Sequence, residues 1–315
     1  MNASPTRVAG SESAIDVRGV TKSFSGKVAV NGITLRVGKG EIFGFLGPNG
    51  SGKTTFMRML CGLLTPDSGE GTCLGYDILR EQARIKLQLG YMTQHFSFYE
   101  DLTIKENLEF VARVYRIRDR KRKVREGLDK LGLTGRSNQL AGELSGGWKQ
   151  RMALSACMLH EPRLLLLDEP TAGVDPKARR DFWDEIHELA AAGLTVMITT
   201  HYMDEAERCH RIAYLSYGDL LAQGTTREVI EQAGLTTWLV EGGDLFSLAS
   251  NLRRLAAVEQ VAAFGNCLHV SGGAAGPLLD QIKPFQVEPY RWRPVPSSLE
   301  DVFIHLMQRK KDNFS

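Results

Sequence analysis

Cysteines are few in this sequence, and long apolar runs are missing. Five of the 315 residues are cysteines and none form a C-x-x-C pair, so we expect them to be small buried apolar residues. Such usage is typical of a protein kept in a reducing compartment. The longest stretch without Asp, Glu, Lys or Arg, residues 260–279, contains four glycines and a proline, so it does not predict a membrane-spanning helix. A role at a membrane would therefore depend on another chain.

A signal peptide and a strong charge imbalance are also absent. The stretch MNASPTRVAGSES has no apolar core, and we expect a disordered lead over residues 1–13. With 39 basic and 37 acidic residues the net charge is +2, which does not indicate a nucleic-acid binder. The composition, 24% charged and 43% hydrophobic, is typical of a soluble globular protein, and the length suggests roughly two domains.

Strands and helices alternate over residues 14–233, which predicts an α/β domain with a mostly parallel core sheet. Residues 14–37 are expected to form N-terminal antiparallel strands, because apolar and polar residues alternate there. The run RLLLLDEP is typical of a strand buried on both faces. Residues 95–155 interrupt the alternation as an inserted helical subdomain, in which Thr103 and Glu106 fit the capping-box pattern.

Residues 234–315 have a different character. They show a strand, a helix, two strands around a Gly265–Asn266 turn, a helix, a strand and a closing helix. This order predicts a small ferredoxin-like α+β domain. The segment contains no motif with chemistry, so an accessory role in stability or dimer support is the simplest interpretation.

A glycine-rich loop follows the short apolar strand EIFGF and precedes the helical stretch TTFMRMLCGLL. Residues 47–54, GPNGSGKT, match the pattern G-x-x-x-x-G-K-[ST]. Glycines let successive backbone N–H groups converge on phosphate oxygens, and the helix that follows adds its positive end. Lys53 would place its charge on the β- and γ-phosphates, and Thr54 would offer a hydroxyl ligand to Mg²⁺. The sequence therefore predicts a nucleotide-phosphate site.

A second candidate position is the end of the strand LLLLDEP, where Asp168 and Glu169 stand. Ligands bind at this end of the strands in open α/β sheets. Asp168 would hold Mg²⁺, and Glu169 would act as a general base on the attacking water. Without the glycine loop, two exposed carboxylates at a strand end would be the simpler interpretation.

Four further positions carry weaker signals. His201, at the end of LTVMITTH, could contact the γ-phosphate, although a lone histidine there is more often a cap or a core residue. Gln94, at the end of LGYMTQ, could reach Mg²⁺ or the water. Phe24 could stack on adenine, although an aromatic in an N-terminal strand is usually part of the core. Residues 145–147, SGG, precede a helix and form either an anion site or an ordinary N-cap.

The order of these motifs resembles the ATPase subunit of ATP-binding-cassette (ABC) transporters, over about residues 15–230. The series comprises the glycine loop, Gln94, LSGG, LLLLDEP, GVD at residues 173–175, and His201. The resemblance implies a P-loop NTPase fold, ATP hydrolysis, and ATP and Mg²⁺ as cofactors. It also implies two cassettes lying head to tail around two ATPs. Each ATP would touch the phosphate loop of one cassette and the Ser-Gly-Gly turn of the other.

The resemblance assigns the site residues to three groups. The expected catalytic residues are Glu169, His201 and Gln94. The expected metal ligands are Thr54, Gln94 and Asp168. The expected nucleotide-binding residues are Phe24, Gly47, Pro48, Asn49, Gly50, Ser51, Gly52, Lys53, Thr54, Thr55, Ser145, Gly146, Gly147 and, at the dimer seam, Asp175. One position departs from the family's commonest signature, which has a glutamine where this chain has Trp148, so what that glutamine contributes stays open.

Two surface segments allow more than one interpretation. Residues 95–108, HFSFYEDLTIKENL, would in this family begin a lever that grips a short helix of the membrane partner, or their aromatics pack the helical subdomain. Residues 116–125, RIRDRKRKVR, contain seven basic residues in ten. They fit a solvated helix start or a surface facing anionic lipid headgroups, with RNA contact a weaker alternative.

The closing sequence PSSLEDVFIHLM is similar to the tails of bacterial export ATPases of the daunorubicin-resistance and multidrug type. We therefore expect separate transmembrane permease subunits, a second copy of this chain as the ATPase partner, and no nucleic acid. The expected location is the cytoplasmic face of the inner membrane, and the expected cargo is a multidrug or lipophilic compound. The alternative is a soluble ABC ATPase acting on ribosomes or DNA, although such proteins usually carry two cassettes or a long coiled coil. A P-loop kinase or GTPase would have no use for LSGG.

Overall fold

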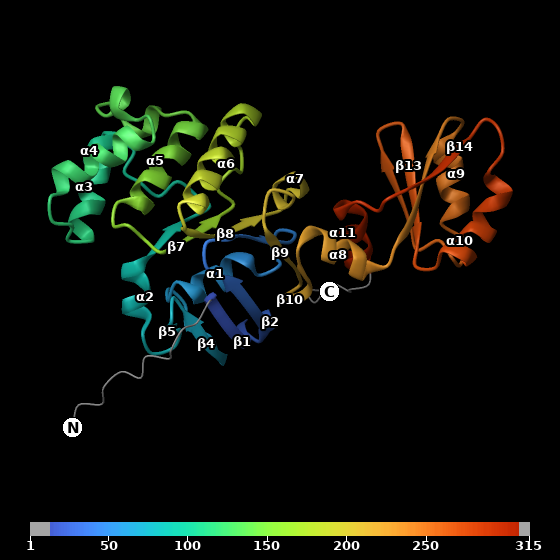
Figure 1. The fold of residues 1–315 in the computed structure, drawn as a ribbon, viewed down its shortest axis with the longest axis horizontal. Helices are drawn as coiled ribbons and strands as arrows, with labels where there is room; N and C mark the ends of the chain where they lie inside the picture. Colours follow the sequence, from blue (N-terminus) through green and yellow to red (C-terminus); the bar gives the residue numbers. More distant parts are fainter. Residues whose placement is uncertain (1–12, 309–315) are drawn as a thin grey trace. The chain divides into compact units, whose positions relative to one another are not determined.

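The computed structural model describes residues 13–308 and divides the chain into two compact units, residues 1–220 and 221–315 (Figure 1). The predicted lead over residues 1–13 lies outside the described residues, apart from Ser13, which begins the first strand. Among the described residues, no helix has the length and apolar character needed to cross a bilayer.

The first unit contains two sheets. The N-terminal sheet is antiparallel with the order β2-β1-β4-β5, which confirms the predicted antiparallel strands. Its strands are β1 Ser13–Phe24, β2 Lys27–Gly38, β4 Ser68–Cys73 and β5 Tyr76–Asp77. The central sheet has the order β10-β9-β3-β8-β7-β6, and β9, β3, β8, β7 and β6 run parallel, as the α/β class predicts. Its strands are β3 Ile42–Leu46, β6 Leu89–Met92, β7 Leu164–Asp168, β8 Thr195–Thr200, β9 Arg211–Ser216 and β10 Asp219–Gly224.

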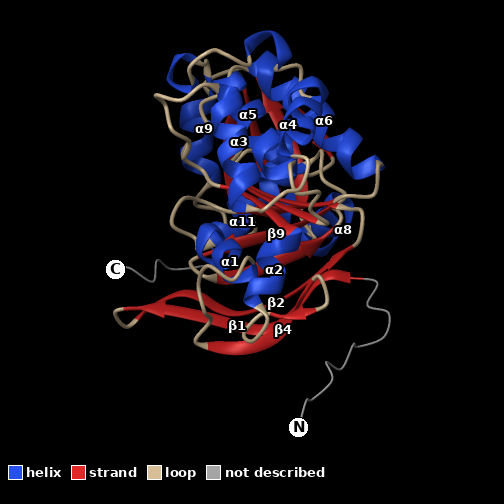
Figure 2. Cartoon of the chain, turned by 90° about the vertical axis from the view of Figure 1, so that its left-hand side faces the viewer, coloured by secondary structure: helices blue, strands red, loops and turns tan. Residues whose placement is uncertain are grey.

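Helices cover both faces of the central sheet. They are α1 Lys53–Leu60, α2 Gln82–Gln88, α3 Ile104–Val114, α4 Arg120–Lys130, α5 Gly146–Met158, α6 Pro176–Ala191 and α7 Met203–Ala206, with short 3₁₀ turns at Thr134–Arg136 and Ala141–Glu143. In Figures 1 and 2 the antiparallel sheet lies on one side of the central sheet, and α3–α6 lie on the other. The four leucines that begin β7 are fully buried because this strand is covered on both faces.

Two local features anchor this arrangement. The Phe56 ring of α1 stacks on the Phe45 ring of β3 at 5.0 Å between centroids, which ties the helix after the glycine loop to the strand before it. Helix α3 begins with the predicted capping box: the Thr103 hydroxyl accepts from the Glu106 N–H, and the Glu106 carboxylate accepts from the Thr103 N–H. The first feature fixes α1 against β3, and the second fixes the start of α3.

Helix α6 carries a half-buried carboxylate with a testable effect on stability. Glu185 Oε2 is buried and has no hydrogen-bond partner among the described residues, and burial raises the pKa of this carboxyl to about 7. An unfolded glutamate has a pKa of about 4.3, so between these values the folded protein holds more protons than the unfolded one. The stabilising contribution of the neutral group is therefore present below pH ~4.3 and is lost as the pH rises to about 7.

We expect Glu185→Gln to raise the melting temperature at pH 8 by roughly 2–4 °C, because it removes a charge whose burial costs on the order of 1 kcal/mol. The gain should shrink towards pH 5, where the carboxyl of the folded protein is neutral. Calorimetry at both pH values measures this, with the exposed Asp184→Asn on the same helix as control. A gain of the same size at both pH values would contradict the raised pKa.

The second unit is an antiparallel sheet with helices. The sheet order is β12-β13-β11-β14, and every neighbouring pair is antiparallel. The chain order strand, helix, strand, strand, helix, strand, helix confirms the predicted ferredoxin-like unit. Its elements are α8 Thr226–Ala233, β11 Thr236–Glu241, α9 Leu245–Leu252, β12 Gln260–Phe264, β13 Cys267–Gly272, α10 Ala275–Ile282, a 3₁₀ turn Lys283–Phe285, β14 Arg291–Val295 and α11 Leu299–Gln308. The domain boundary at residues 233/234 stays a prediction, and the compact units divide within β10.

Candidate nucleotide-binding site

The glycine loop connects β3 to α1 and is packed so tightly that two of its glycines admit no side chain. A Cβ on Gly47 would lie 2.1 Å from the Leu215 carbonyl oxygen, and a Cβ on Gly52 would lie 2.2 Å from the Ala29 carbonyl oxygen. Both glycines also have positive φ, which side chains disfavour. The middle of the loop, Asn49 and Gly50, is exposed. The loop is therefore held at both ends by strand backbone and presents its centre outward.

Lys53 lies folded back over this loop. Its Nζ donates to the carbonyl oxygens of Gly47 and Pro48, at 2.7 and 3.1 Å, and lies 3.3 Å from Glu169 Oε1. Burial lowers the pKa of Lys53, and the negative charge of Glu169 partly offsets that effect. The Ser51 hydroxyl in the same loop is buried and has no hydrogen-bond partner among the described residues. A buried cation and an unsatisfied hydroxyl fit an incoming phosphate group.

The two predicted carboxylates stand at the end of β7 and are tied to the neighbouring strand β8. The Thr199 hydroxyl donates to Asp168 Oδ1 at 2.6 Å, and the Glu169 N–H donates to the Thr199 hydroxyl at 2.9 Å. The Tyr91 hydroxyl donates to Asp168 Oδ2 at 3.4 Å. Glu169 itself has φ of 47°, an unusual backbone conformation for a residue with a side chain. The turn after β7 is thus bent to aim this carboxylate at Lys53.

Glu169 is the point at which the predicted residues converge. Gln94 Nε2, from the segment after β6, donates to Glu169 Oε2 at 3.0 Å. His201 Nδ1, from the end of β8, lies 3.5 Å from the same oxygen without forming a hydrogen bond. Lys53 faces the other carboxylate oxygen. The structure therefore brings Lys53, Gln94, Glu169 and His201 together from four separate segments.

The Ser-Gly-Gly turn is placed apart from this group. Ser145 is the N-cap residue of α5, but its hydroxyl makes no capping hydrogen bond, and both Ser145 and Gly146 are exposed. A Cβ on Gly147 would lie 2.7 Å from the Ala178 Cβ of α6, so close helix packing explains the second glycine. Within residues 13–308, no hydrogen bond or ion pair joins this turn to the glycine loop. The turn is an exposed helix N-terminus whose donors face outward.

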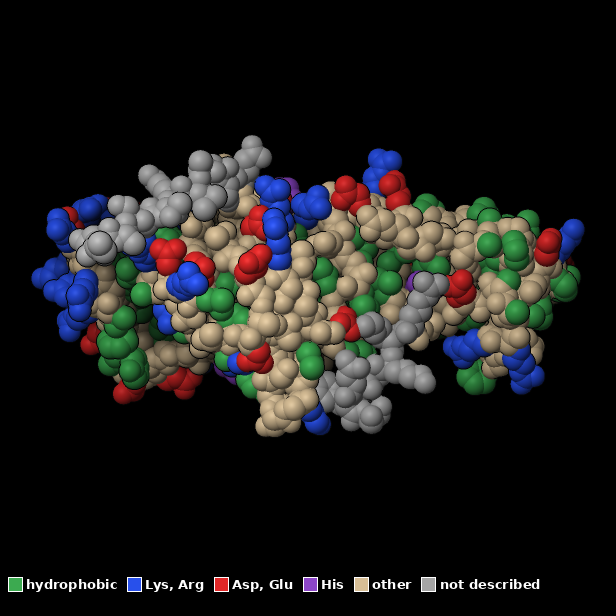
Figure 3. Space-filling view, turned by 90° about the horizontal axis from the view of Figure 1, so that it is seen from below, with side chains coloured by type: hydrophobic (Ala, Val, Ile, Leu, Met, Phe, Trp, Pro, Cys, Tyr) green, Lys and Arg blue, Asp and Glu red, His purple; other side chains and the backbone are tan. Residues whose placement is uncertain are grey.

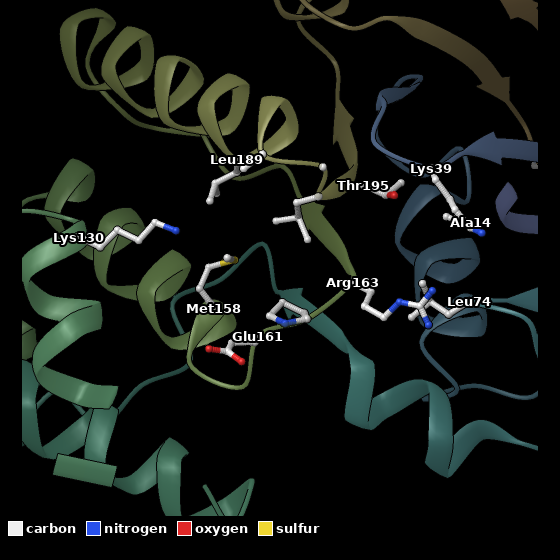
Figure 4. Close-up of a pocket in the computed structure, with 13 residues that line it drawn as sticks. Ala14, Lys39, Leu74, Lys130, Met158, Glu161, Arg163, Leu189 and Thr195 are labelled. Atoms are coloured by element: carbon white, nitrogen blue, oxygen red, sulfur yellow. The ribbon is translucent and has the colours of Figure 1, made fainter. Parts of the chain in front are cut away.

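A cavity of about 370 Å³ lies at the opposite edge of the central sheet (Figure 4). It is lined by Thr195, which begins β8, and by side chains from the ends of α5 and α6, such as Met158 and Leu189. None of the predicted nucleotide-binding residues line it. The site residues predicted from the sequence therefore lie away from this cavity, at the carboxyl ends of the parallel strands.

Comparison with known proteins decides the family. The family model described as ABC transporter matches residues 30–172. The Nod factor export ATP-binding protein I of Rhizobium sp. (strain N33) is 37% identical over 306 residues, which cover 96% of this chain and 99% of that protein. The chain belongs to the ABC transporter ATP-binding family. The ABC ATPase fold predicted from the sequence is confirmed, and the protein is an ATPase of this family.

Other relatives of this ABC ATPase agree. The probable multidrug ABC transporter ATP-binding protein YbhF of Escherichia coli (strain K12) is 44% identical over 224 residues, or 70% of this chain. The chain spans 39% of the length of that relative. A solved ATP-binding subunit of an ABC transporter matches with a TM-score of 0.64 at 28% identity, covering 70% of this chain and 93% of that one. The ATP-binding cassette MJ0796, solved as a dimer with ADP and Pi, matches with a TM-score of 0.62 at 27% identity, covering 67% and 98%.

The unusual Trp148 of this ABC ATPase lies close to two arginines. Its ring lies 4.6 Å from the Arg136 guanidinium carbon and 5.6 Å from that of Arg151. Arg151 also lies 3.8 Å from Asp181 of α6. Trp148 thus ties the start of α5 to the 3₁₀ turn at Thr134–Arg136.

The two outlying predicted residues have distinct surroundings. Phe24 ends β1 at the first hairpin and is 48% exposed, so it is not the core aromatic that its strand position first indicates. Lys22 Nζ lies 5.8 Å from its ring centroid. Asp175 caps α6, because its carboxylate accepts from the N–H groups of Lys177 and Ala178. Thr54 and Thr55 are half-buried on the first turn of α1.

Sequence reasoning missed two residues that support this site. The Thr199 hydroxyl joins the Asp168 carboxylate to the backbone N–H of Glu169, and the only signal for it was a pair of threonines at the end of a mainly apolar strand. Glu205 on α7 is fully buried, and its carboxylate accepts from the hydroxyls of Thr171 and Thr200. Arg179 Nε lies 3.7 Å from it. Glu205 thereby links the segments that follow Glu169 and precede His201.

Proposed function

We propose that two ABC ATPase chains close around two ATPs and that hydrolysis reopens them to drive export through separate membrane subunits. One observation carries this proposal: the Ser145 turn is exposed, its hydroxyl caps nothing, and it is not joined to the glycine loop of its own chain. An anion site without a local anion is suited to a γ-phosphate held by a facing chain. The relatives named as Nod factor export and multidrug ATP-binding proteins support the export role.

Within one site, the proposed chemistry centres on Glu169. This carboxylate accepts a proton from the attacking water, and Gln94 and His201 beside it orient that water. Lys53 leaves Glu169 and the loop carbonyls to contact the β- and γ-phosphates, so ATP binding frees the base. Thr54 and Asp168 offer oxygen ligands that fit Mg²⁺, which would neutralise phosphate charge. Residues 47–55 and Phe24 hold the phosphates and the adenine.

Between the two chains, we propose that the γ-phosphate of each bound ATP forms the bridge. Its charge is satisfied only when Lys53 of one chain and the Ser145 turn of the other both reach it. Hydrolysis removes the γ-phosphate and with it the contacts that attract the two chains to each other. The closed dimer is then no longer lower in free energy than the open state, and the dimer opens. Asp175, at the start of α6 next to the Ser145 turn, would lie at the seam.

The proposed contact with the membrane subunits is the segment of residues 95–108, which begins beside Gln94. Its Tyr99 is 53% exposed, and the Tyr99 ring meets edge-on, at 5.4 Å, the ring of Phe110, which lies on α3 just beyond the segment and is 45% exposed. Exposed aromatics at one site favour a docking surface. With this contact we infer that the ATPase works at the cytoplasmic face of the inner membrane, and the names of its relatives support a multidrug or lipophilic cargo.

Replacing Ser145 with arginine is expected to reduce ATP turnover to the background level while the monomer binds ATP as before. The bulky cation blocks the surface that receives the partner's γ-phosphate, but it touches nothing in the glycine loop of its own chain. Turnover and equilibrium binding of a fluorescent ATP analogue measure the two effects. Loss of monomer binding would mean that the turn belongs to the local site.

Mixing provides the matched control. A Ser145→Arg chain retains a sound glycine loop, and a Lys53→Ala chain retains a sound Ser145 turn, so a mixed dimer contains one complete site. Mixing the two inactive variants should therefore restore part of the activity. Two variants that stay inactive on their own and in mixture would point to sites completed within one chain.

A further inference from the structure

The loop between α3 and α4 and the first turns of α4 form a basic corner, defined as residues 116–125. Seven of its ten residues are Lys or Arg, and six of these seven are exposed. Figure 3 shows Lys and Arg side chains gathered at the end of the first unit where α3 and α4 lie, next to hydrophobic side chains. None of these residues belongs to the nucleotide site.

Nearby acidic residues neutralise only part of this charge. Arg122 pairs with Asp119 and Glu126, at 3.7 and 2.5 Å. Lys123 pairs with Glu161, from the segment before β7. Among the described residues, the other five cations of the corner have no carboxylate within ion-pair distance. Like charges held this close repel one another, and an anionic surface relieves that repulsion.

An apolar strip on α3 borders the basic corner. Phe110 and Val114 are 45% and 61% exposed. They are four residues apart, so they share one face of the helix about 6 Å from each other. The basic corner begins two residues after Val114. Cations beside exposed apolar side chains are the pattern of surfaces that lie in a membrane interface. Of these two side chains only Phe110 has a ring on which a nucleic-acid base could stack, whereas both suit a membrane interface, which favours lipid over RNA.

We propose that the basic corner, with Phe110 and Val114, binds anionic lipid headgroups. The cations contact the phosphates, and the two apolar side chains enter the layer between headgroups and acyl chains. This rests on the proposed function, because Tyr99 of the membrane-subunit segment touches Phe110, which puts the corner next to the bilayer once the permease is engaged. The ATPase would then hold the membrane at two places, protein and lipid.

The test is sedimentation of the purified chain with vesicles. We expect binding to vesicles of equal parts phosphatidylcholine and phosphatidylglycerol, little binding to phosphatidylcholine alone, and a steep loss with added salt. Arg118→Gln, Lys121→Gln and Arg125→Gln together should weaken binding about 100-fold, since each basic residue near an anionic surface contributes roughly a factor of five. Basal ATP turnover should be unchanged, because these residues lie outside the site.

The matched control changes three other exposed cations of the same unit, Arg36, Lys39 and Arg80, to glutamine. This control variant has the same net charge as the triple variant of the basic corner, but it should bind vesicles like the wild type. Equal losses in the two triple variants, or equal binding to both kinds of vesicle, would overturn the proposal. Binding to poly(U) at a salt concentration that abolishes vesicle binding would assign the corner to RNA. If the vesicle results hold while Ser145→Arg retains full turnover, the proposed function fails and the lipid surface stands.

Discussion

Replacing Lys53 with alanine is expected to lower ATP turnover by roughly a thousandfold or more. Lys53 is 4% exposed, and its Nζ is the cation that faces Glu169 across the end of the glycine loop. Once ATP binds, the same charge is available to the phosphates, where no water competes with it. Alanine removes the charge and leaves the phosphate oxygens without that partner.

The measurement is steady-state phosphate release, together with ATP affinity by calorimetry. Lys86→Ala, an exposed lysine on α2, is the matched control and should retain full activity. Circular dichroism establishes that the Lys53→Ala variant is folded. A folded variant with normal turnover would refute the assignment of residues 47–54 as the phosphate loop.

Changing Glu169 to glutamine is the second large expected effect. Turnover should fall by roughly 10²–10⁴-fold, because glutamine cannot take the proton from water. The amide keeps the shape of the carboxylate, and its oxygen can still accept from Gln94. ATP should therefore remain bound between two chains that cannot pass to the open state, and the dimer should accumulate.

Light scattering in the presence of ATP measures this as a doubling of the molar mass. The exposed Glu188→Gln on α6 provides a control that should hydrolyse ATP and remain mainly monomeric. A Glu169→Gln chain that holds ATP tightly as a monomer would argue against a nucleotide shared between two chains. A variant with normal turnover would remove Glu169 from the role of general base.

The sequence predicts local features of this molecule well because short-range chemistry sets them. The capping box at Thr103 and Glu106 involves residues three positions apart, and the structure contains both of its hydrogen bonds. The glycines of the phosphate loop are required by backbone conformation, although the contacts that exclude a Cβ, with Leu215 and Ala29, come from distant strands. Motif spacing thus predicts the loop, but the tertiary fold explains its rigidity.

Features that depend on which strands are neighbours are beyond sequence patterns. Thr199 reaches Asp168 and Glu169 only because β8 lies next to β7 in the sheet, an order that no local pattern reveals. Glu205 sits on the short helix α7, whose four residues give no periodic signal. Trp148 marked a departure from the family pattern, yet its contacts with Arg136 and Arg151 required the positions of two other segments.

The central claim is that catalysis needs two chains, and dilution of the purified ATPase tests it most directly. Initial rates of ATP hydrolysis are measured per mole of chain at saturating ATP and Mg²⁺ over falling protein concentration. If the γ-phosphate must meet Ser145 of a second chain, the rate per mole should fall in proportion to concentration once dimers dissociate. A rate per mole that stays constant down to concentrations at which light scattering detects only monomers, with and without ATP, would contradict the account.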